Sequence, residues 1–97
     1  MPNGVLEFEW DPKKATSNLR KHRVSFEEAT SVFDDPLATV YEDPDHSATE
    51  KRFLTIGTST KRRLIHVAFA DRDERIRIIT ARPVTRNERE LYEKENR

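Results

Sequence analysis

The hydrophobic residues in the first third of the chain recur at helical spacing. Asp11 followed by Pro12 predicts a helix start, because aspartate caps free N–H groups and proline fits the first helical position. Ala15, Leu19 and His22 then stand at i, i+4 and i+7 and form one stripe of a helix that ends near residue 22. This stripe predicts that His22 lies partly buried beside the core.

A second helix is predicted after Ser25, because Glu28 follows it at the spacing of a capping box. The apolar face of this helix consists of Phe26, Ala29, Val32 and Phe33. The helix has to end before Asp35 and Pro36, since the residue ahead of a proline disfavours the helical conformation.

Beyond residue 36 the pattern changes to short segments rich in β-branched and aromatic residues. Four strands are predicted, over residues 37–42, 52–59, 63–71 and 75–84, and residues 8–10 form a further short extended segment. The connections between the four strands are short, which favours antiparallel neighbours.

Side chains alternate between the two faces of a strand, so the last two strands predict how the faces of the sheet are made. The third strand has one clearly apolar face, formed by Ile65, Val67 and Phe69, with Leu64, His66 and Ala68 opposite. In the fourth strand, alternation places Ile76, Ile78, Thr80 and Arg82 on one face and Arg77, Ile79 and Ala81 on the other. One face of the sheet is therefore expected to be apolar and the other mixed.

A final helix is predicted over residues 86–95, because Thr85 and Glu88 repeat the capping-box spacing. Leu91 and Tyr92 are its only large apolar residues, so we expect it to be weakly anchored. The 97 residues suffice for one domain with one core. We therefore predict a single α+β domain over residues 1–97, with N-terminal helices, an antiparallel sheet of about four strands and a C-terminal helix.

The net charge is zero, but the charge is unevenly distributed along the chain. Residues 1–50 hold 5 basic and 11 acidic residues, a net charge of −6, whereas residues 51–97 hold 13 and 7, a net charge of +6. This asymmetry suggests a basic face for an anionic partner; a solvated surface is the open alternative. The lack of cysteine, of a long apolar stretch and of a secretion signal favours a cytoplasmic protein.

Four arginines at strand ends, within strands and at a helix start are candidates for phosphate binding: Arg63, Arg77, Arg82 and Arg86. A guanidinium offers a flat fork of donors that fits a phosphate, and antiparallel neighbours bring such positions close together. A cluster of them would hold an RNA or DNA backbone. Alternatively, the same arginines pair on a solvated face with the acids Asp71, Asp73, Glu74, Glu88 and Glu90.

No metal site and no cofactor is expected. The three histidines are far apart in the sequence and none stands at metal-ligand spacing from another. Asp43, Asp45, His46 and Glu50 offer oxygen and nitrogen ligands to a cation, but their segment lacks the glycine of a calcium loop. Contact with a basic partner chain is the favoured role of this segment. With two glycines in the chain, no loop is suited to cradle a nucleotide.

Chemistry that needs neither metal nor cofactor remains open. RNA carries its own nucleophile, the 2′-hydroxyl, so its cleavage requires a base, cations that stabilise the charged phosphorane and an acid for the leaving oxygen. Arginines, a histidine and a tyrosine would suffice. His22 is a candidate because histidine titrates near neutral pH, although a histidine near a helix end is often a packed residue that bonds the last carbonyls.

Four segments together make the chain resemble the BrnT family of bacterial type II toxins. They are EWDPKKATSNLRKHRVSFEEATSVFDDP, DPDHS followed by EKRFLTIGTS, RRLIHVAFADR, and IRIITARPVTRNERELYE. This resemblance, which covers residues 8–93, implies a ribonuclease toxin of RelE-like α+β fold that cleaves RNA without a metal and inhibits translation. It also implies a cognate antitoxin, BrnA, whose DNA-binding domain lets the pair repress its own promoter.

The resemblance also assigns site residues to this chain. A Lys-His pair, two strand arginines, a helix-opening arginine and glutamate, and a late tyrosine of the family fall on Lys21, His22, Arg63, Arg82, Arg86, Glu88 and Tyr92. We expect Arg63 and Arg82 to converge in one pocket and to bind the scissile phosphate. His22, Glu88 or Tyr92 would then transfer protons, and Lys21, Arg62 and Arg86 would hold the RNA backbone.

The chain departs from the family pattern at Arg23 and Arg62, where the family usually has glycine. If the backbone at Arg23 needs a left-handed conformation, a residue other than glycine costs roughly 1 kcal/mol and the His22 side chain is re-aimed. Arg62 instead adds a cation beside Arg63, which does not weaken phosphate binding.

Two other functions stay open. One is a non-catalytic module that binds nucleic acid or a partner protein through the same basic face. The other is a metal-dependent nuclease built on Asp43, Asp45 and His46. Cleavage of RNA in EDTA separates the metal-free ribonuclease from both.

Overall fold

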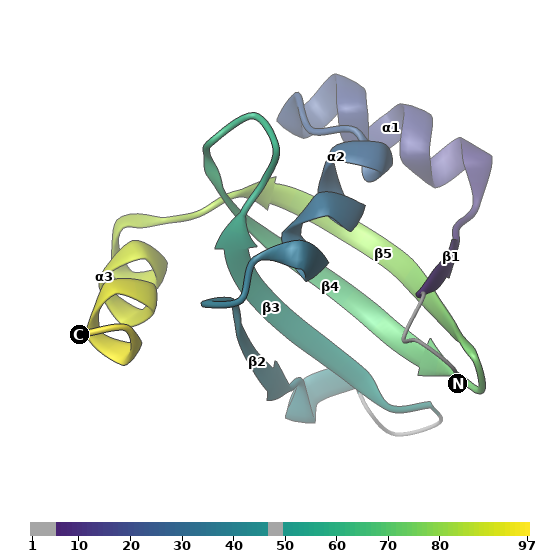
Figure 1. Ribbon diagram of the computed structural model, residues 1–97. Helices are drawn as coiled ribbons and strands as arrows, with labels where there is room; N and C mark the ends of the chain where they lie inside the picture. Colours follow the sequence, from purple (N-terminus) through teal and green to yellow (C-terminus); the bar gives the residue numbers. More distant parts are fainter. Residues whose placement is uncertain (1–5, 47–49) are drawn as a thin grey trace.

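The computed structural model describes residues 6–46 and 50–97. Its elements follow one another as β1 (Glu7–Glu9), α1 (Pro12–His22), α2 (Phe26–Ser31), a 3-10 turn (Val32–Asp34), β2 (Thr39–Glu42), a second 3-10 turn (Pro44–His46), β3 (Arg52–Thr58), β4 (Leu64–Arg72), β5 (Arg75–Pro83) and α3 (Arg86–Glu95). In Figure 1, α1 and α2 lie over one face of the sheet and α3 lies beside one end of it. The predicted α+β class and the three predicted helices are confirmed.

The helix caps expected from the sequence form in the structure. Asp11 caps α1, and Ser25 Oγ accepts the N–H of Glu28 at 2.9 Å at the start of α2. Thr85 makes the full capping box with Glu88, since each side chain accepts the backbone N–H of the other. The carboxylate of Glu28 does not complete the box at α2, because it turns toward the connection between β3 and β4. None of the helices within the described ranges combines the length and the apolar character that a membrane crossing requires.

The sheet has five strands in the order β1-β5-β4-β3-β2 and is mixed rather than antiparallel. The pairs β2–β3, β3–β4 and β4–β5 are antiparallel, as predicted. The fifth strand is β1, which pairs in parallel with β5 from Glu7 opposite Arg75 to Glu9 opposite Arg77. The sequence predicted an antiparallel sheet of about four strands; the sheet has five, and the additional strand is parallel to its neighbour. β1 has three residues, too few for its pattern of hydrophobic and polar residues to indicate that it pairs with a strand distant along the chain.

A β-bulge on β5 corrects the predicted assignment of side chains to faces. The register between β4 and β5 shifts by one residue, so Ile79 has no partner residue on β4. As a result Ile78 and Ala81 both lie in the core under α1 and α2, whereas Thr80 and Arg82 turn to the opposite face. Simple alternation, which placed Ile78 together with Arg82, is wrong beyond residue 78. The face opposite α1 and α2 is called the open face below.

The core lies between the sheet and the two N-terminal helices. Its buried residues are Val24, Phe26, Ala29, Val32, Ile65, Val67, Phe69, Ile78 and Ala81. The apolar faces predicted for α2 and for β4 are thereby confirmed. The ring of Phe33 lies edge-on between Phe8 and Phe69, with centroids 5.1 and 4.9 Å away, which attaches β1 to this core.

The buried stripe of α1 differs from the predicted one. Ala15 packs against the core and His22 is half-buried, as expected. Leu19, however, is 49% exposed, and the buried residue of the helix is its neighbour Asn18, which is 6% exposed. The stripe therefore runs through Ala15, Asn18 and His22, because the side chain of Asn18 satisfies backbone groups that a leucine could not.

Asn18 joins α1 to the outer edge of β5. Its Oδ1 accepts the N–H of Ala81 at 3.1 Å, and its Nδ2 donates to the carbonyl of Ala81 at 2.8 Å and to that of Val24 at 2.9 Å. The side-chain amide thus occupies the place of a neighbouring strand at Ala81, where β1 no longer accompanies β5. These bonds fix the position of α1 along the strand.

Candidate active site

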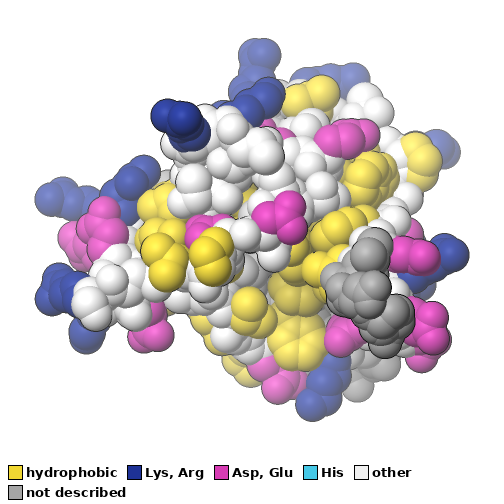
Figure 2. Space-filling view, viewed as in Figure 1, with side chains coloured by type: hydrophobic (Ala, Val, Ile, Leu, Met, Phe, Trp, Pro, Cys, Tyr) yellow, Lys and Arg dark blue, Asp and Glu magenta, His cyan; other side chains and the backbone are white. Residues whose placement is uncertain are grey.

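Ion pairs join the two oppositely charged halves of the chain. Arginines of the second half bind acids of the first half in the pairs Arg63–Glu28, Arg72–Glu9, Arg72–Glu50, Arg75–Glu7, Arg75–Glu9 and Arg77–Glu9. Much of the asymmetry along the sequence therefore cancels in space. Arg77 does form an ion pair, as the open alternative expected, but its partner is Glu9, which was not among the acids named for it. Figure 2 shows the side covered by α1 and α2, where hydrophobic side chains occupy the middle and lysines and arginines mostly follow the outline.

Arg63 is held by α2. Its Nε and Nη2 donate to the two carboxylate oxygens of Glu28 at 2.7 and 2.6 Å, and Nη2 also donates to the carbonyl of Arg23 at 2.7 Å. Ser59 Oγ donates to the same carboxylate at 2.7 Å. Glu28 is 4% exposed, and the hydrogen bonds from Arg63 hold its pKa below the ordinary value despite this burial. The guanidinium therefore serves first as the partner of a buried carboxylate.

Arg82 and Glu88 form a second two-point ion pair, at the end of the open face near α3. The Nη1 and Nη2 atoms of Arg82 donate to the two oxygens of Glu88, both at 2.8 Å. These bonds from Arg82, aided by the N–H of Thr85, lower the pKa of Glu88 to about 2. Arg82 Nη1 also donates to the carbonyl of Pro83 at 3.2 Å.

His66 lies beside this pair on the open face, opposite Arg82 in the register of β4 and β5. Its Nε2 is 3.7 Å from Glu88 Oε2, the residue is 8% exposed, and its buried Nδ1 has no hydrogen-bond partner in the part of the chain that the structure describes. Burial, and then the charge of Arg82, lower the pKa of His66, so the imidazole is neutral at pH 7. Tyr41 of β2 is near enough that Glu88 adds to the effect of burial in raising its pKa.

The structure does not bring Arg63 and Arg82 together. Arg63 reaches Glu28 on α2, on the side of the core, whereas Arg82 lies on the open face with His66. The expected convergence of the two arginines in one pocket is therefore wrong for this structure. The reason is the alternation of side chains along β4. Arg63 directly precedes this strand and lies on the same side as the buried Ile65, whereas His66, which pairs with Arg82, lies on the open face.

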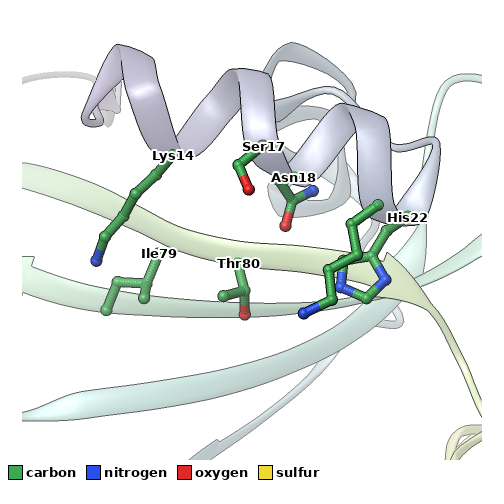
Figure 3. A pocket seen from close by; sticks show the side chains of 7 residues that line it. Lys14, Ser17, Asn18, His22, Ile79 and Thr80 are labelled. Carbon is green, nitrogen blue, oxygen red and sulfur yellow. The ribbon is translucent and has the colours of Figure 1, made fainter.

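Lys21 and His22 do come together, in a hollow between α1 and β5. The hollow has a volume of about 220 Å³, and its lining residues are Lys14, Ser17, Asn18, Lys21, His22, Ile79 and Thr80. In Figure 3 the labelled side chains of α1 point toward the strand. His22 is therefore half-buried at a basic hollow and not in the cluster around Arg82.

The remaining predicted residues are dispersed. Tyr92 lies one turn after Glu88 on α3 and its hydroxyl donates to Asp35 at 2.8 Å, whereas Arg86 is exposed and 3.8 Å from Glu90. Arg62 is exposed in the turn before β4.

Arg23 and Arg62 both adopt left-handed backbone conformations, with φ of 61° and 63°. Arg23 is the residue that ends α1, and its N–H donates to the carbonyl of Leu19 at 2.9 Å. The condition considered for position 23, a left-handed backbone, is thus met in the structure, and position 62 has the same conformation.

Within residues 6–46 and 50–97, no three potential ligands gather in a way that would hold a metal ion. Of the acidic segment considered above, Asp43 Oδ1 accepts the N–H of Asp45 at 3.1 Å, and Glu50 binds Arg72 at 3.0 Å. The side chain of His46 lies outside what the structure describes.

His66, Tyr41 and Asn18 were not among the site residues chosen from the sequence. The only sequence signal for His66 is its place on the mixed face of its strand, because the bulge at Ile79, which alternation does not show, brings Arg82 to that face. Tyr41 and Asn18 depend on contacts between elements that local patterns do not encode.

Comparison with known structures finds a similar small α+β fold. The crystal structure of the Brucella abortus ribonuclease toxin, BrnT, matches with a TM-score of 0.64 and 20% sequence identity over 84% of this chain and 100% of that chain. At this identity the match shows the fold. Residues 10–88 match the model of the family described as the ribonuclease toxin BrnT of type II toxin-antitoxin systems. The chain therefore belongs to the BrnT family, as its motifs suggested. No curated protein matches the sequence.

Proposed function

We propose that this BrnT-family chain is an endoribonuclease that cleaves RNA without a metal ion. The RNA's own 2′-hydroxyl attacks the adjacent phosphate and forms a 2′,3′-cyclic phosphate, while the bond to the 5′-oxygen of the next nucleotide breaks and that oxygen takes up a proton. Such a reaction requires a cation at the phosphate and groups that accept and donate protons. The observation that supports it is the cluster on the open face, where Arg82 pairs with Glu88 at 2.8 Å and the neutral His66 lies 3.7 Å from the same carboxylate.

Within this cluster, Arg82 binds the scissile phosphate and stabilises the charge that develops on it. In the free chain its two terminal nitrogens bind Glu88, so a phosphate would take over part of that fork. Before the phosphate binds, Glu88 orients the guanidinium of Arg82. It is a weak base because its pKa is about 2, whereas the neutral imidazole of His66 is a better proton acceptor near pH 7.

The other residues assigned from the sequence take supporting roles in this proposal. Arg63 and Tyr92 stabilise the fold, since Arg63 is bound to Glu28 and Tyr92 to Asp35. The side chains proposed to lie along the RNA are Lys21, His22, Arg62 and Arg86. We further propose that the fold is related to that of RelE-like toxins.

The test is cleavage of RNA by the purified chain in EDTA. We expect cleavage with products that end in a 2′,3′-cyclic phosphate, because that is the product of attack by the 2′-hydroxyl. Arg82→Ala should lower the rate by about 10²-fold or more. Arg75→Ala is the matched control, because it removes an exposed arginine from the far end of the same strand. Cleavage that EDTA abolishes, or binding without cleavage, would overturn the proposal.

The family also leads us to propose a cytoplasmic toxin that inhibits translation and is neutralised by a BrnA-like antitoxin, which binds DNA so that the pair represses its own promoter. Expression of the chain alone should stop growth and degrade RNA, and co-expression with the neighbouring gene should restore growth. The purified pair should shift a promoter fragment that the toxin alone does not shift. Growth arrest with intact RNA would contradict this part of the proposal.

A further inference from the structure

Four cations on α1 have no partner side chain within the part of the chain that the structure describes. Pro12–His22 contains no acidic residue and carries Lys13, Lys14, Arg20 and Lys21. None of these four side chains has an ion pair or hydrogen bond with another residue in the described ranges, whereas the strand arginines are largely neutralised by carboxylates. α1 therefore offers an anionic partner four positive charges that no carboxylate among the described residues neutralises, in the half of the sequence that is acidic overall.

Two of these lysines line a groove rather than a flat surface. Lys14 and Lys21 are two helical turns apart and border the hollow of about 220 Å³ between α1 and β5. In Figure 3 the side chains of Lys14 and Ser17 point from the helix toward the strand, where Ile79 and Thr80 form the other wall. The hydroxyls of Ser17 and Thr80 add hydrogen-bond donors between the two cations.

The groove is held open by buried contacts. Asn18 fastens α1 to the edge of β5 through its three hydrogen bonds to Ala81 and Val24. β1 accompanies β5 only as far as Arg77, and the bulge at Ile79 follows directly, so the groove lies where the edge of the sheet is left without a neighbouring strand. A site built this way needs little rearrangement before it binds.

Through Thr80 the groove borders the open face, which carries the candidate active site. Thr80 lies on the open face, two residues before Arg82 on the same strand, which corresponds to a separation of about 7 Å along the strand. A chain of phosphates that passes Arg82 can therefore continue across Thr80 into the groove between the lysines.

We propose that the groove between α1 and β5 is a binding site for the backbone of single-stranded RNA next to the cleaved bond. Lys14 and Lys21 bind phosphates there, and Ser17 and Thr80 donate hydrogen bonds to them. This proposal rests on the ribonuclease function proposed above. Phosphate contacts of this kind position the RNA without reading its sequence.

The test uses a 2′-O-methyl oligoribonucleotide, which lacks the attacking hydroxyl and so stays intact during a binding titration. The double variant Lys14→Ala/Lys21→Ala should bind about 10-fold or more weakly than the natural chain. Its slope of log affinity against log salt should fall in magnitude by about 1.4, because each phosphate contact to a single strand contributes about 0.7. On unmodified RNA the same variant should raise KM and leave kcat largely unchanged.

The matched control is Lys51→Ala/Lys94→Ala, which removes the same charge from exposed positions outside α1 and outside the groove. It should keep the affinity and the salt slope of the natural chain. Equal losses in both double variants, or no loss in either, would refute the proposed site, as would a groove variant that loses antitoxin binding but keeps its affinity for RNA. Failure of the natural chain to cleave unmodified RNA would instead refute the proposed function, and the two results can be told apart.

Discussion

Arg63 and Glu28 form a two-point ion pair that ties three segments of the chain together. The guanidinium comes from the turn before β4, the carboxylate from the first turn of α2, and the carbonyl of Arg23 at the end of α1 accepts a further bond. The carboxylate is buried, so its charge depends on these donors and on Ser59. The pair thus fixes the junction of the two helices against the sheet.

Removing the guanidinium should therefore destabilise the fold. We expect Arg63→Ala to lower the free energy of unfolding by about 2 kcal/mol, because it leaves a buried carboxylate with fewer donors; the partial exposure of Arg63 keeps the loss below that of a fully buried pair. Arg63→Lys should lose less, since it keeps the charge but not the fork. Urea unfolding measures the change. A variant of unchanged stability that has lost RNA cleavage would show instead that Arg63 contacts the RNA.

The left-handed residues at positions 23 and 62 give a prediction of opposite sign. Arg23→Gly and Arg62→Gly should each raise the free energy of unfolding by about 1 kcal/mol, because glycine adopts a positive φ without strain. For a domain of this size the thermal midpoint should rise by roughly 4–8 °C. Asp73→Gly is the control: Asp73 also has a positive φ, of 54°, but aspartate tolerates it better, so the gain should be smaller. Equal gains at all three positions would argue against this account.

Local signals in the sequence predicted the elements of this fold well, because they act over a few residues. Asp11, Ser25 and Thr85 cap the three helices, and the apolar face of β4 is the one that alternation gives. The parallel pairing of β1 and the bulge at Ile79 were missed, since both depend on how distant segments meet. Because of that bulge, Arg82 lies on the open face and Ile78 on the opposite one. Alternation along β5 had placed both on the same face, so it could not predict the site.

Asn18 shows the same limit within a helix. Hydrophobicity favours Leu19 as the buried residue of α1, yet the polar neighbour is buried because it bonds backbone groups of β5 and of the segment after the helix. The pattern of one helix cannot show which backbone N–H and C=O groups of another element lack a hydrogen-bond partner. The sequence therefore predicted the chemistry of the site, an arginine with a carboxylate. It did not predict which other residues would surround that pair.

Substitution of Asn18 should accordingly cost more than substitution of Leu19. Asn18→Ala removes three buried hydrogen bonds and should lower the free energy of unfolding by roughly 3 kcal/mol, at about 1 kcal/mol for each bond. Leu19→Ala, at an exposed position of the same helix, should stay within about 0.5 kcal/mol of the natural chain. Chemical denaturation of both variants provides the comparison, and a reversed order would show that Asn18 does not hold α1 as described.

The low pKa of Glu88 predicts an acid-sensitive contribution to stability. The pKa falls from an ordinary 4.5 to about 2 on folding, so the unfolded chain binds the proton more tightly. The contribution, about 3 kcal/mol, is complete above about pH 4.5 and is lost as the pH falls toward 2. The stability difference between the natural chain and Glu88→Gln should therefore shrink between pH 5 and pH 2.5. Glu90→Gln, on the exposed side of the same helix, should show no such convergence.

His66 predicts how the activity depends on pH. Arg82 and Glu88 face it from β5 and α3, and the charge of Asp43 also acts on it; burial together with Arg82 lowers its pKa. If the neutral imidazole accepts the proton of the 2′-hydroxyl, kcat/KM should fall on the acid side as His66 becomes protonated. The midpoint should lie below the ordinary histidine value of about 6.5.

The variants separate His66 from His22, the other histidine near the proposed RNA path. His66→Gln should lower kcat/KM by about 10²-fold or more and remove the acid limb, because glutamine cannot accept the proton. His22→Gln should keep the limb, since His22 lines the groove of α1 and lies outside the cluster of Arg82. An acid limb that persists in His66→Gln and vanishes in His22→Gln would transfer the role of base to His22.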